Sequence, residues 1–184
     1  MSTDSDNEDV PVRSSLRLKA DRASAVRCNT LICVLENPAN LGNIGTVIRN
    51  INSFGVRSLY VVDGKNVLPS TWPEMRTNPR LMDTSSSAIK WTFVKKFATT
   101  ADCLAHLKAK GFESYATSPH IKGRENVSLE SGKFTNRKLA IWFGNEVKGL
   151  TNEALDGCST CIQIPISGIV ESLNLAVSTG IVMY

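Results

Sequence analysis

Long apolar runs are missing from this sequence of 184 residues. No stretch approaches the roughly 20 apolar residues that a membrane-spanning helix needs. The first residues are acidic and polar, so the basic and apolar pattern of a signal peptide is missing too. We therefore expect a cytoplasmic protein. A hydrophobic content of 42% is enough for one core, so we expect one folded domain.

Histidine is scarce, and the cysteines form no disulfide framework. The two histidines are His106 and His120, and the five cysteines, an odd number, have no regular spacing. This pattern favours reduced thiols. Cys158 and Cys161 form a CxxC pair, but a structural zinc site needs four ligands. We therefore favour buried or incidental thiols over a redox centre and expect no metal site.

Several motifs of catalysis and nucleotide binding are also absent. There is no GxxxxGK[ST] sequence, which excludes a P-loop, and no GxGxxG follows a predicted strand. Neither HExxH nor an ordered Ser-His-Asp set is present, so nothing indicates hydrolysis. The net charge of +4 is modest, so the distribution of the basic residues is more informative than their sum.

Residues 1–27 differ in composition from the rest of the chain. Acidic residues come first and basic residues follow, with almost no aromatic or β-branched side chains. This composition is typical of a disordered tail, so we predict that the folded domain covers residues 28–184. The basic half of the tail either contacts RNA or is simply solvated, and the sequence leaves both alternatives open.

The folded part begins with a strand, a helix and a second strand. The continuous apolar run at residues 31–35 predicts a strand buried on both faces. A helix with Asn40 as its N-cap is predicted for residues 41–54, because apolar side chains fall on one arc at helical spacing: Ile44, Val47, Ile48, Ile51 and Phe54. Gly55 ends this helix, and residues 58–62 form the next strand. Such a βαβ unit predicts a parallel sheet in an α/β protein.

Further strands are predicted for residues 92–97, 112–116 and 139–143, and a further helix for residues 100–110. Two long connections lie between these elements. Residues 63–91 are predicted to be an irregular excursion with one short helix at residues 85–90, and residues 117–138 form the second connection. Both connections are rich in Lys and Arg, as is the tail. Three basic segments favour a phosphate-rich partner.

Two loops are the candidates for a ligand site. Residues 144–150 follow one predicted strand, and residues 165–172 follow another at 161–164. In parallel sheets, ligands bind outside the carboxyl ends of the strands. Ser172 is predicted to cap a final helix, whose apolar stripe mixes large and very small side chains and so allows close packing. Glu146 lies between two glycines and is either a structural cap or a ligand contact.

Three segments of the chain resemble the ordered motifs of one family. They are residues 40–49 (NLGNIGTVIR) with Phe54 and Gly55, residues 143–150 (FGNEVKGL) and residues 164–174 (IPISGIVESLN). Their wording and order are similar to those of the SpoU (TrmH) family, in the SPOUT superfamily of RNA methyltransferases. The resemblance extends over residues 31–184. It implies an α/β, Rossmann-like fold with a parallel sheet flanked by helices and a C-terminal deep trefoil knot, an exception to the rule of unknotted chains.

The resemblance also implies a function. Members of the family transfer a methyl group from S-adenosylmethionine to a ribose 2′-hydroxyl of tRNA or rRNA, and they act as homodimers. Matching the motifs position by position implies these catalytic residues: Asn43, Arg49, Glu146, Ser172 and Asn174. The residues implied to bind the cofactor are Thr117, Gly144, Glu146, Gly149, Ile164, Ile166, Ser172 and Leu173. The candidates for RNA contacts are Arg49, Lys122 and Arg124.

Arg49 has a particular place in this comparison. In such dimers it is expected near the cofactor of the partner subunit, so each site would use both chains. A guanidinium has a pKa above roughly 12 and is unsuited to act as a base. We therefore expect Arg49 to hold a phosphate and to stabilise negative charge that develops on the 2′-oxygen.

Two alternatives to this function differ in chemistry. The first is a non-catalytic RNA-binding or assembly protein that retains the fold. The second is methylation of a base, although the polar motif residues are those of the ribose-modifying enzymes. We expect tRNA rather than rRNA, since no separate RNA-binding domain precedes the methyltransferase domain. The chain ends inside a helix that many relatives continue, so we expect some dimer or substrate contacts to be missing.

Overall fold

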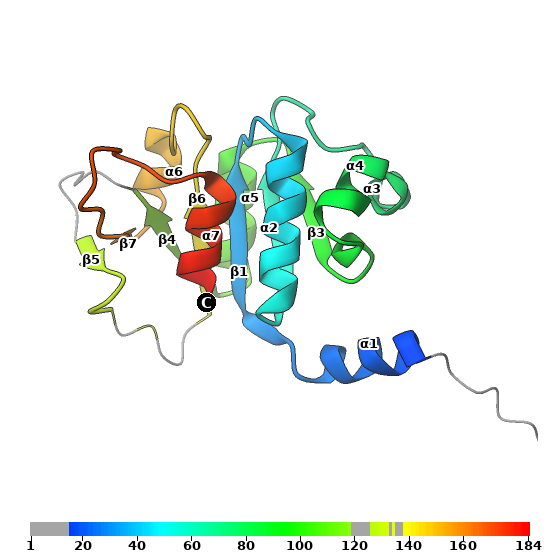
Figure 1. Cartoon of the computed structure of the whole chain (residues 1–184). Coiled ribbons are helices and arrows are strands. Elements are labelled where there is room, and N and C mark those ends of the chain that lie inside the picture. Colours follow the sequence, from blue (N-terminus) through cyan, green and yellow to red (C-terminus); the bar gives the residue numbers. More distant parts are fainter. Residues whose placement is uncertain (1–14, 119–125, 133, 135–137) are drawn as a thin grey trace, which may run out of the picture.

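The computed structural model describes residues 15–118, 126–132, 134 and 138–184. Seven parallel strands form one sheet with helices on both faces (Figure 1). The strands are β1 (Cys28–Glu36), β2 (Val56–Val62), β3 (Phe93–Phe97), β4 (Glu113–Thr117), β5 (Asn126–Ser128), β6 (Leu139–Phe143) and β7 (Thr160–Gln163). Their order across the sheet is β3-β2-β1-β6-β4-β7-β5. The predicted α/β architecture is confirmed, whereas the trefoil knot stays a prediction because strand order does not test it.

The helices divide the core into two layers. One face of the sheet is covered by α2 (Leu41–Ser53) and α7 (Leu175–Met183), and the other by α5 (Thr100–Ala109) and α6 (Asn152–Asp156). Each face has its own cluster of buried apolar side chains. The sheet is therefore buried on both sides, as parallel sheets require.

Strand β1 shows why a continuous apolar run was the correct signal. Cys33 and Leu35 pack in the cluster under α2, whereas Ile32 and Val34 pack in the cluster under α5. All four side chains are at most 3% exposed. Since neighbouring residues on a strand point to opposite faces, a strand between two helical layers must be apolar at every position. The predicted double burial of β1 is confirmed.

Helix α2 forms where its apolar arc predicted it. The Asn40 side chain accepts a hydrogen bond of 2.7 Å from the Gly42 N–H, which confirms the N-cap. The predicted helix extended to Phe54, but the helix ends one residue before it, and Phe54 is 39% exposed. Gly45 allows a close approach of the excursion to the helix, since a Cβ there would lie 1.8 Å from the Thr84 Oγ1.

The excursion after β2 is more ordered than predicted. It contains α3 (Trp72–Thr77), α4 (Pro79–Thr84) and the 3-10 helix η1 (Ala88–Lys90). The short helix predicted for residues 85–90 corresponds to η1, whereas α3 and α4, which precede it, were not predicted. Thr71 and Asn78 cap α3 and α4, and a proline stands in the first turn of each helix. These capping signals were present in the sequence, but the helices are too short to show a period.

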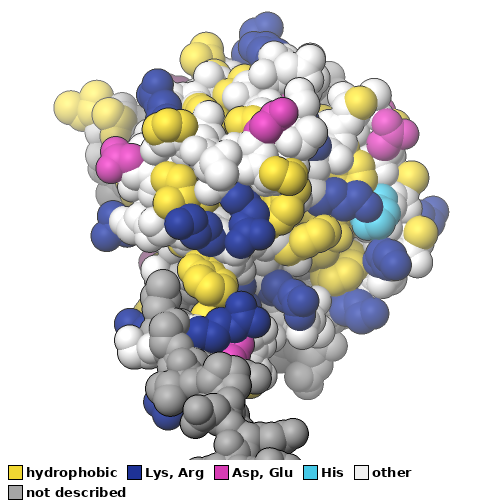
Figure 2. All heavy atoms as spheres, turned by 90° about the vertical axis from the view of Figure 1, so that its right-hand side faces the viewer, with side chains coloured by type: hydrophobic (Ala, Val, Ile, Leu, Met, Phe, Trp, Pro, Cys, Tyr) yellow, Lys and Arg dark blue, Asp and Glu magenta, His cyan; other side chains and the backbone are white. Residues whose placement is uncertain are grey.

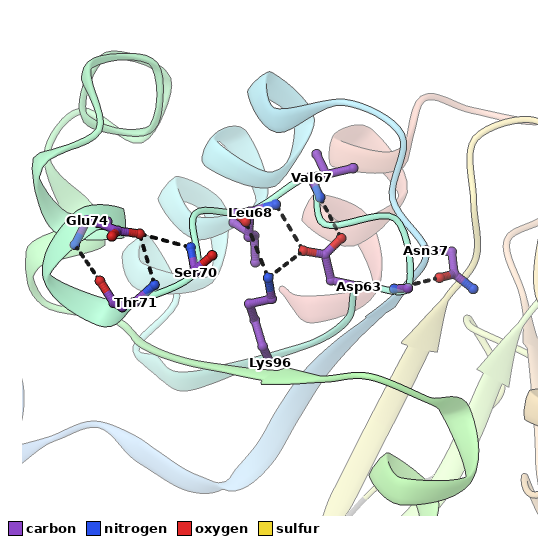
Figure 3. Close-up of polar contacts among 9 residues, drawn as sticks. Asn37, Asp63, Val67, Leu68, Ser70, Thr71, Glu74 and Lys96 are labelled. Atoms are coloured by element: carbon purple, nitrogen blue, oxygen red, sulfur yellow. Dashed lines mark hydrogen bonds and ion pairs between the residues drawn. The ribbon is translucent and has the colours of Figure 1, made fainter.

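Figure 3 shows how the start of this excursion is fixed. The buried Asp63 carboxylate accepts hydrogen bonds from the N–H groups of Val67 (2.8 Å) and Leu68 (3.0 Å), and it lies 3.1 Å from the Lys96 Nζ. Lys96 also donates to the Leu68 carbonyl oxygen at 3.3 Å. A buried carboxylate thus organises a loop that sequence periodicity described only as irregular.

The C-terminal helix α7 begins two residues later than predicted. Its N-cap is Asn174, whose side chain accepts a 2.8 Å hydrogen bond from the Ala176 N–H. The prediction of Ser172 as N-cap was therefore wrong, because the chain is still irregular there. Helix α6 and the three-residue strand β5 were not predicted, since both are too short to carry a periodic signal.

The N-terminal segment contains one helix, α1 (Ser15–Ala25), in the part that was predicted to be a disordered tail. This helix is mostly exposed and extends away from the sheet (Figure 1). Its mean hydropathy is low, so it has no apolar face to bury. Residues 1–14 lie outside the described part of the chain. Among the described residues, no helix is long and apolar enough to cross a membrane.

Candidate active site

A cavity of about 330 Å³ lies at the carboxyl ends of β4, β6 and β7. Its walls come from the loop after β6, the loop after β7 and the end of β4. All the residues predicted to bind a cofactor line it: Thr117, Gly144, Glu146, Gly149, Ile164, Ile166, Ser172 and Leu173. Sequence positions that are more than 50 residues apart thus meet in one cavity at the sheet edge where ligands bind.

The cavity also has walls that the sequence reasoning missed. Lys148 and Glu171 line it, although they were not selected within the two loop motifs. Leu155 comes from α6, which was not predicted at all, and Ser178 comes from α7. The first two stood next to chosen residues and could have been found there. No local signal indicated that Leu155 would face the same cavity.

The loop after β6 is a tight hairpin. Asn145 and Gly149 exchange two backbone hydrogen bonds of 3.0 and 2.9 Å. Gly149 has a φ of +68°, which a side chain would disfavour. A Cβ on Gly144 would lie 2.1 Å from the carbonyl carbon of Gly149, so the two backbones touch. These glycines are needed to close the hairpin, and its backbone then forms one wall of the cavity.

A buried carboxylate ties the base of this hairpin to β1. Glu36 is 1% exposed and accepts hydrogen bonds from the Thr151 N–H at 2.8 Å and the Thr151 Oγ1 at 2.6 Å. It also accepts a 2.5 Å hydrogen bond from the Thr100 Oγ1 on α5. A second tie is the Asn145 side chain, which donates to the Asn37 carbonyl oxygen at 2.7 Å. The hairpin is therefore held at both of its ends by the carboxyl end of β1.

Glu146 connects the hairpin to the first turn of α2. One carboxylate oxygen accepts a 2.8 Å hydrogen bond from the Ala39 N–H, and the other accepts a 2.9 Å hydrogen bond from the Asn43 side chain. Partial burial raises the pKa of Glu146, but the hydrogen bonds from Asn43 and Ala39 outweigh it and hold the pKa below its usual value. The carboxylate is thus ionised at neutral pH, and both its oxygens are engaged.

Asn43 extends this connection to α7. The Asn174 Nδ2 lies 3.4 Å from the Asn43 Oδ1, while the Asn174 Oδ1 caps α7. Three of the predicted catalytic residues, from three distant motifs, therefore form one hydrogen-bonded chain: Glu146, Asn43 and Asn174. This chain begins at the cavity, which Glu146 lines, and leads away from it to Asn43 and Asn174.

The remaining predicted residues have different positions. Ser172 lines the cavity and is exposed. Arg49 is exposed on α2 and lines no part of the cavity, and within the described part of the chain its guanidinium makes no hydrogen bond or ion pair. A single chain therefore does not bring Arg49 into its own site. Lys122 and Arg124 lie outside the described residues.

A second cavity, of about 690 Å³, lies between α2 and α7. Asn43 and Asn174 stand at one end of it, so it adjoins the hydrogen-bonded chain. Its other walls are mainly apolar side chains that are exposed to solvent: Phe54, Val177, Ile181 and Tyr184. The rings of Phe54 and Tyr184 meet edge to face, 5.5 Å apart. An exposed apolar surface of this kind is typical of an interface.

Comparisons with known proteins place the chain among RNA methyltransferases. A model of the SpoU rRNA Methylase family matches residues 30–184. The tRNA (guanosine(18)-2′-O)-methyltransferase of Borreliella burgdorferi is 29% identical over 91% of this chain and 71% of its own length. The enzyme of the same name from Escherichia coli is 30% identical over 77% of this chain, which spans about half of that relative (56%).

Solved structures give the same picture. The Aquifex aeolicus TrmH/SpoU tRNA modifying enzyme has a TM-score of 0.74 and 26% identity over 92% of this chain and 81% of its own. A structure described as showing the 2-OH methylation of C/U34 on tRNA has a TM-score of 0.65 and 28% identity, over 83% of this chain and 90% of its own. An AdoMet-bound rRNA methyltransferase from Sinorhizobium meliloti shares the fold. It is 23% identical, with a TM-score of 0.71, and the match covers 88% of this chain and 57% of its own.

Proposed function

We propose that this chain, which belongs to the SpoU rRNA Methylase family, transfers a methyl group from S-adenosylmethionine to a ribose 2′-hydroxyl of RNA. The observation that carries the proposal is that two motifs line one cavity and the third is hydrogen-bonded to it. The hairpin after β6 and the loop after β7 wall this cavity, and a chain of hydrogen bonds leads from its lining residue Glu146 to Asn43 and Asn174. Relatives named as RNA methyltransferases support it.

The cavity suits the chemical groups of this cofactor. Ile164, Ile166 and Leu173 offer apolar surface for an adenine ring, and the exposed hydroxyl of Ser172 offers a polar group for the ribose. The bound cofactor supplies a methyl group on a positively charged sulfonium, which is a good leaving group. What remains for the protein is to align the 2′-oxygen with that methyl group and to assist the loss of its proton.

Glu146 positions this site rather than acting as its base. Its pKa is lowered and both carboxylate oxygens already accept hydrogen bonds, so it has little capacity to take a proton. Its contacts instead hold the hairpin against the first turn of α2. Ser172 lines the same cavity without any partner in the described part of the chain, so its hydroxyl is free to contact the cofactor or the ribose.

A homodimer would complete the site. The exposed apolar groove between α2 and α7 is the surface that we propose a second copy covers. Arg49 is exposed on the same helix, one turn from the groove residue Thr46. Across such an interface the Arg49 guanidinium would reach the partner's cavity. There it would hold a phosphate and stabilise negative charge on the 2′-oxygen.

We propose tRNA as the substrate class. Two relatives are named as tRNA (guanosine(18)-2′-O)-methyltransferases, and the Aquifex aeolicus enzyme is described as tRNA modifying. This chain also covers 90% of the protein in the structure concerned with C/U34 of tRNA. The family description, in contrast, names rRNA. The test therefore includes both classes of RNA.

The decisive measurement is the transfer of labelled methyl groups from S-adenosylmethionine to total tRNA and, separately, to rRNA. Digestion of the product to nucleosides then identifies the methylated atom. We expect label on a ribose 2′-oxygen of tRNA. Label on a base would contradict the ribose assignment. Binding of the cofactor without transfer to either RNA would instead support a non-catalytic role.

Complementation between two inactive variants tests the shared site. Arg49→Ala removes the proposed contribution to the partner's cavity, and Gly144→Ala distorts the chain's own cavity. In a heterodimer of the two, one of the two sites has an intact cavity and an intact partner Arg49. Mixing equal amounts should therefore restore about a quarter of the wild-type activity, since half of the dimers are mixed. No recovery after exchange of subunits would show that Arg49 acts within its own chain.

A further inference from the structure

The β3 edge of the sheet carries a second chemically distinctive surface. Figure 2 shows this side of the molecule, where Lys and Arg side chains surround exposed hydrophobic ones. We define the β3-edge surface by the residues that compose it: Arg27, Arg57, Lys90, Trp91, Phe93 and Lys95. The cavity proposed to bind the cofactor lies on β4, β6 and β7, in the other half of the sheet. The β3-edge surface is therefore not part of that site.

Two arginines lie close together at this surface, because Cys28 and Val56, the neighbours of Arg27 and Arg57 in the sequence, pair with each other. The Arg27 guanidinium donates a hydrogen bond to the Trp91 carbonyl oxygen. Burial, and then the positive charge of Arg57, lower the pKa of Arg27. Neither arginine forms an ion pair with any described residue, and the Arg57 side chain has only a 3.4 Å hydrogen bond to Asn29. Like charges held together without a carboxylate are destabilising, so an anion that binds between them would relieve a cost.

Aromatic side chains are exposed beside these charges. Trp91 is 36% exposed and Phe93 is 50% exposed. Phe93 pairs with Ser58, the residue after Arg57, so it lies at the same end of the sheet as the arginine pair. Lys90 is adjacent in sequence to Trp91. Lys95 is two residues beyond Phe93 on the same face of β3, with its Nζ 5.1 Å from the centre of the Phe97 ring.

Protection of an edge strand explains only part of this pattern. Lysines on an edge strand hinder unwanted pairing with other strands, and Lys95 fits that role. Exposed aromatic rings have the opposite effect, because they promote association. Arg27 precedes β1 and Arg57 is near the start of β2, so they do not lie on the edge strand. Cations interleaved with exposed aromatic rings are instead the combination that binds nucleic acid, through phosphates and stacked bases.

We propose that the β3-edge surface binds a part of the substrate RNA remote from the methylated nucleotide. Phosphates lie between Arg27, Arg57 and Lys90, and unpaired bases stack on Trp91 and Phe93. The identity of the RNA as the methylation substrate rests on the proposed function. The RNA contact itself rests only on the charges and rings of the surface.

The position of this surface sets a requirement for the RNA. The arginine pair is at the amino ends of β1 and β2, whereas the cavity opens at the carboxyl ends of β4, β6 and β7. Strands are about 4.8 Å apart, so three to five strand spacings separate β3 from β6 and β7, roughly 14 to 24 Å. An RNA that contacts both regions must therefore span the sheet between them, as a folded RNA with separate arms does.

A charge-reversal pair with a matched control tests the proposal. Arg57→Glu with Lys90→Glu changes two exposed residues of the surface. Lys110→Glu with Lys138→Glu produces the same change in net charge on exposed residues near the starts of β4 and β6. Binding of total tRNA to each full-length protein is measured by fluorescence anisotropy over a range of salt concentrations, and S-adenosylmethionine binding is measured by calorimetry.

We expect the surface pair to weaken tRNA binding by about 10- to 100-fold and to make the salt dependence shallower by roughly one to two released ions. The control pair should change tRNA binding by less than threefold. In methyl transfer, the surface pair should raise the KM for tRNA and leave kcat at saturating tRNA unchanged.

The outcomes separate this proposal from the proposed function. Equal loss of tRNA binding in both double variants would overturn the proposed RNA contact at the β3-edge surface, since net charge alone would then explain the effect. Unchanged tRNA binding by the surface pair would overturn it too, even if methyl transfer proceeds normally. If no RNA is methylated but the surface pair alone loses tRNA binding, the surface stands and the enzymatic function fails. Trp91→Leu, which keeps an apolar side chain but removes the ring, should weaken binding by about fivefold.

Discussion

Two long connections leave the carboxyl ends of strands in this sheet, and they are built in opposite ways. The β2–α3 connection (residues 63–71) is fixed by its own polar groups, because Asp63, Lys96 and Glu74 bond most of its turns (Figure 3). The β7–α7 connection (residues 164–174) is mostly exposed. Between residues 165 and 173, no hydrogen bond is made within the described part of the chain.

The difference separates structure from function. A loop whose polar groups are satisfied internally has a single conformation and offers little to a ligand. A loop that leaves backbone and hydroxyl groups free can use them for a ligand, at a cost in its own stability. The β7–α7 connection walls the cavity and the β2–α3 connection does not. Substitutions in the β7–α7 connection should therefore change binding and activity. Substitutions in the β2–α3 connection should change stability.

The largest effect is expected for Asp63→Ala in the β2–α3 connection. The variant leaves the Lys96 ammonium without its buried partner and removes two hydrogen bonds to backbone N–H groups. The free energy of unfolding should fall by about 3 kcal/mol. Urea denaturation measures this loss. The matched control is Asp83→Ala, at an exposed position of α4, which should cost less than about 0.5 kcal/mol. Equal losses of unfolding free energy in Asp63→Ala and Asp83→Ala would contradict the inference that Asp63 fixes the β2–α3 connection.

A smaller effect, on binding as well as stability, is expected for Glu36→Gln. Neutralising this buried carboxylate weakens its charge-assisted hydrogen bonds to Thr151 and Thr100, which hold the base of the cavity hairpin. Affinity for S-adenosylmethionine should fall about tenfold, with roughly 2 kcal/mol of stability lost. Calorimetric titration measures the affinity. Thr151→Ser, which keeps the hydroxyl, should bind the cofactor almost normally. A stable Glu36→Gln protein with wild-type affinity would show that the hairpin needs no anchor.

Ser172→Ala should change activity without changing stability. The Ser172 side chain lines the cavity and has no partner among the described residues, so removing its hydroxyl breaks no contact within the fold. Methyl transfer should fall about tenfold, which corresponds to one hydrogen bond of about 1.4 kcal/mol in the transition state. The control is Ser167→Ala, in the same connection but away from the cavity lining. If the melting temperature of Ser172→Ala drops markedly, the connection is held by contacts of its own.

The smallest effect concerns the pH dependence at Glu146. Its pKa is lower in the folded chain than the ordinary value of 4.5, so its ionised form stabilises the fold above that pH. This contribution is lost as the pH falls below 4.5 and the carboxylate takes up a proton. Glu146→Gln should therefore show a shallower loss of unfolding free energy in acid, by less than about 1 kcal/mol. If the unfolding free energies of the wild type and Glu146→Gln fall in parallel as the pH is lowered, the contacts with Asn43 and Ala39 do not stabilise the ionised carboxylate.

Much of the fold was predictable from local chemistry. The apolar run of β1 and the apolar arc of α2 predicted a parallel α/β sheet, because burial on one or two faces imposes a period on the sequence. Short elements were not predictable in this way. Helices α3, α4 and α6 have five or six residues, too few to show a period. Phe54 and Ser172 were misassigned by one or two residues at helix ends, where the period stops.

The motifs also indicated which residues belong to the candidate site, through the resemblance rather than through spacing. The sequence alone determined which loops follow strands and which residues they contain. Only the tertiary structure decided that Glu146, Asn43 and Asn174 touch, that Glu36 anchors the hairpin, and that Arg49 stays outside its own chain's cavity. The physical reason is that periodicity reports burial on one element. Contacts between elements depend on strand order, and no local pattern encodes that order.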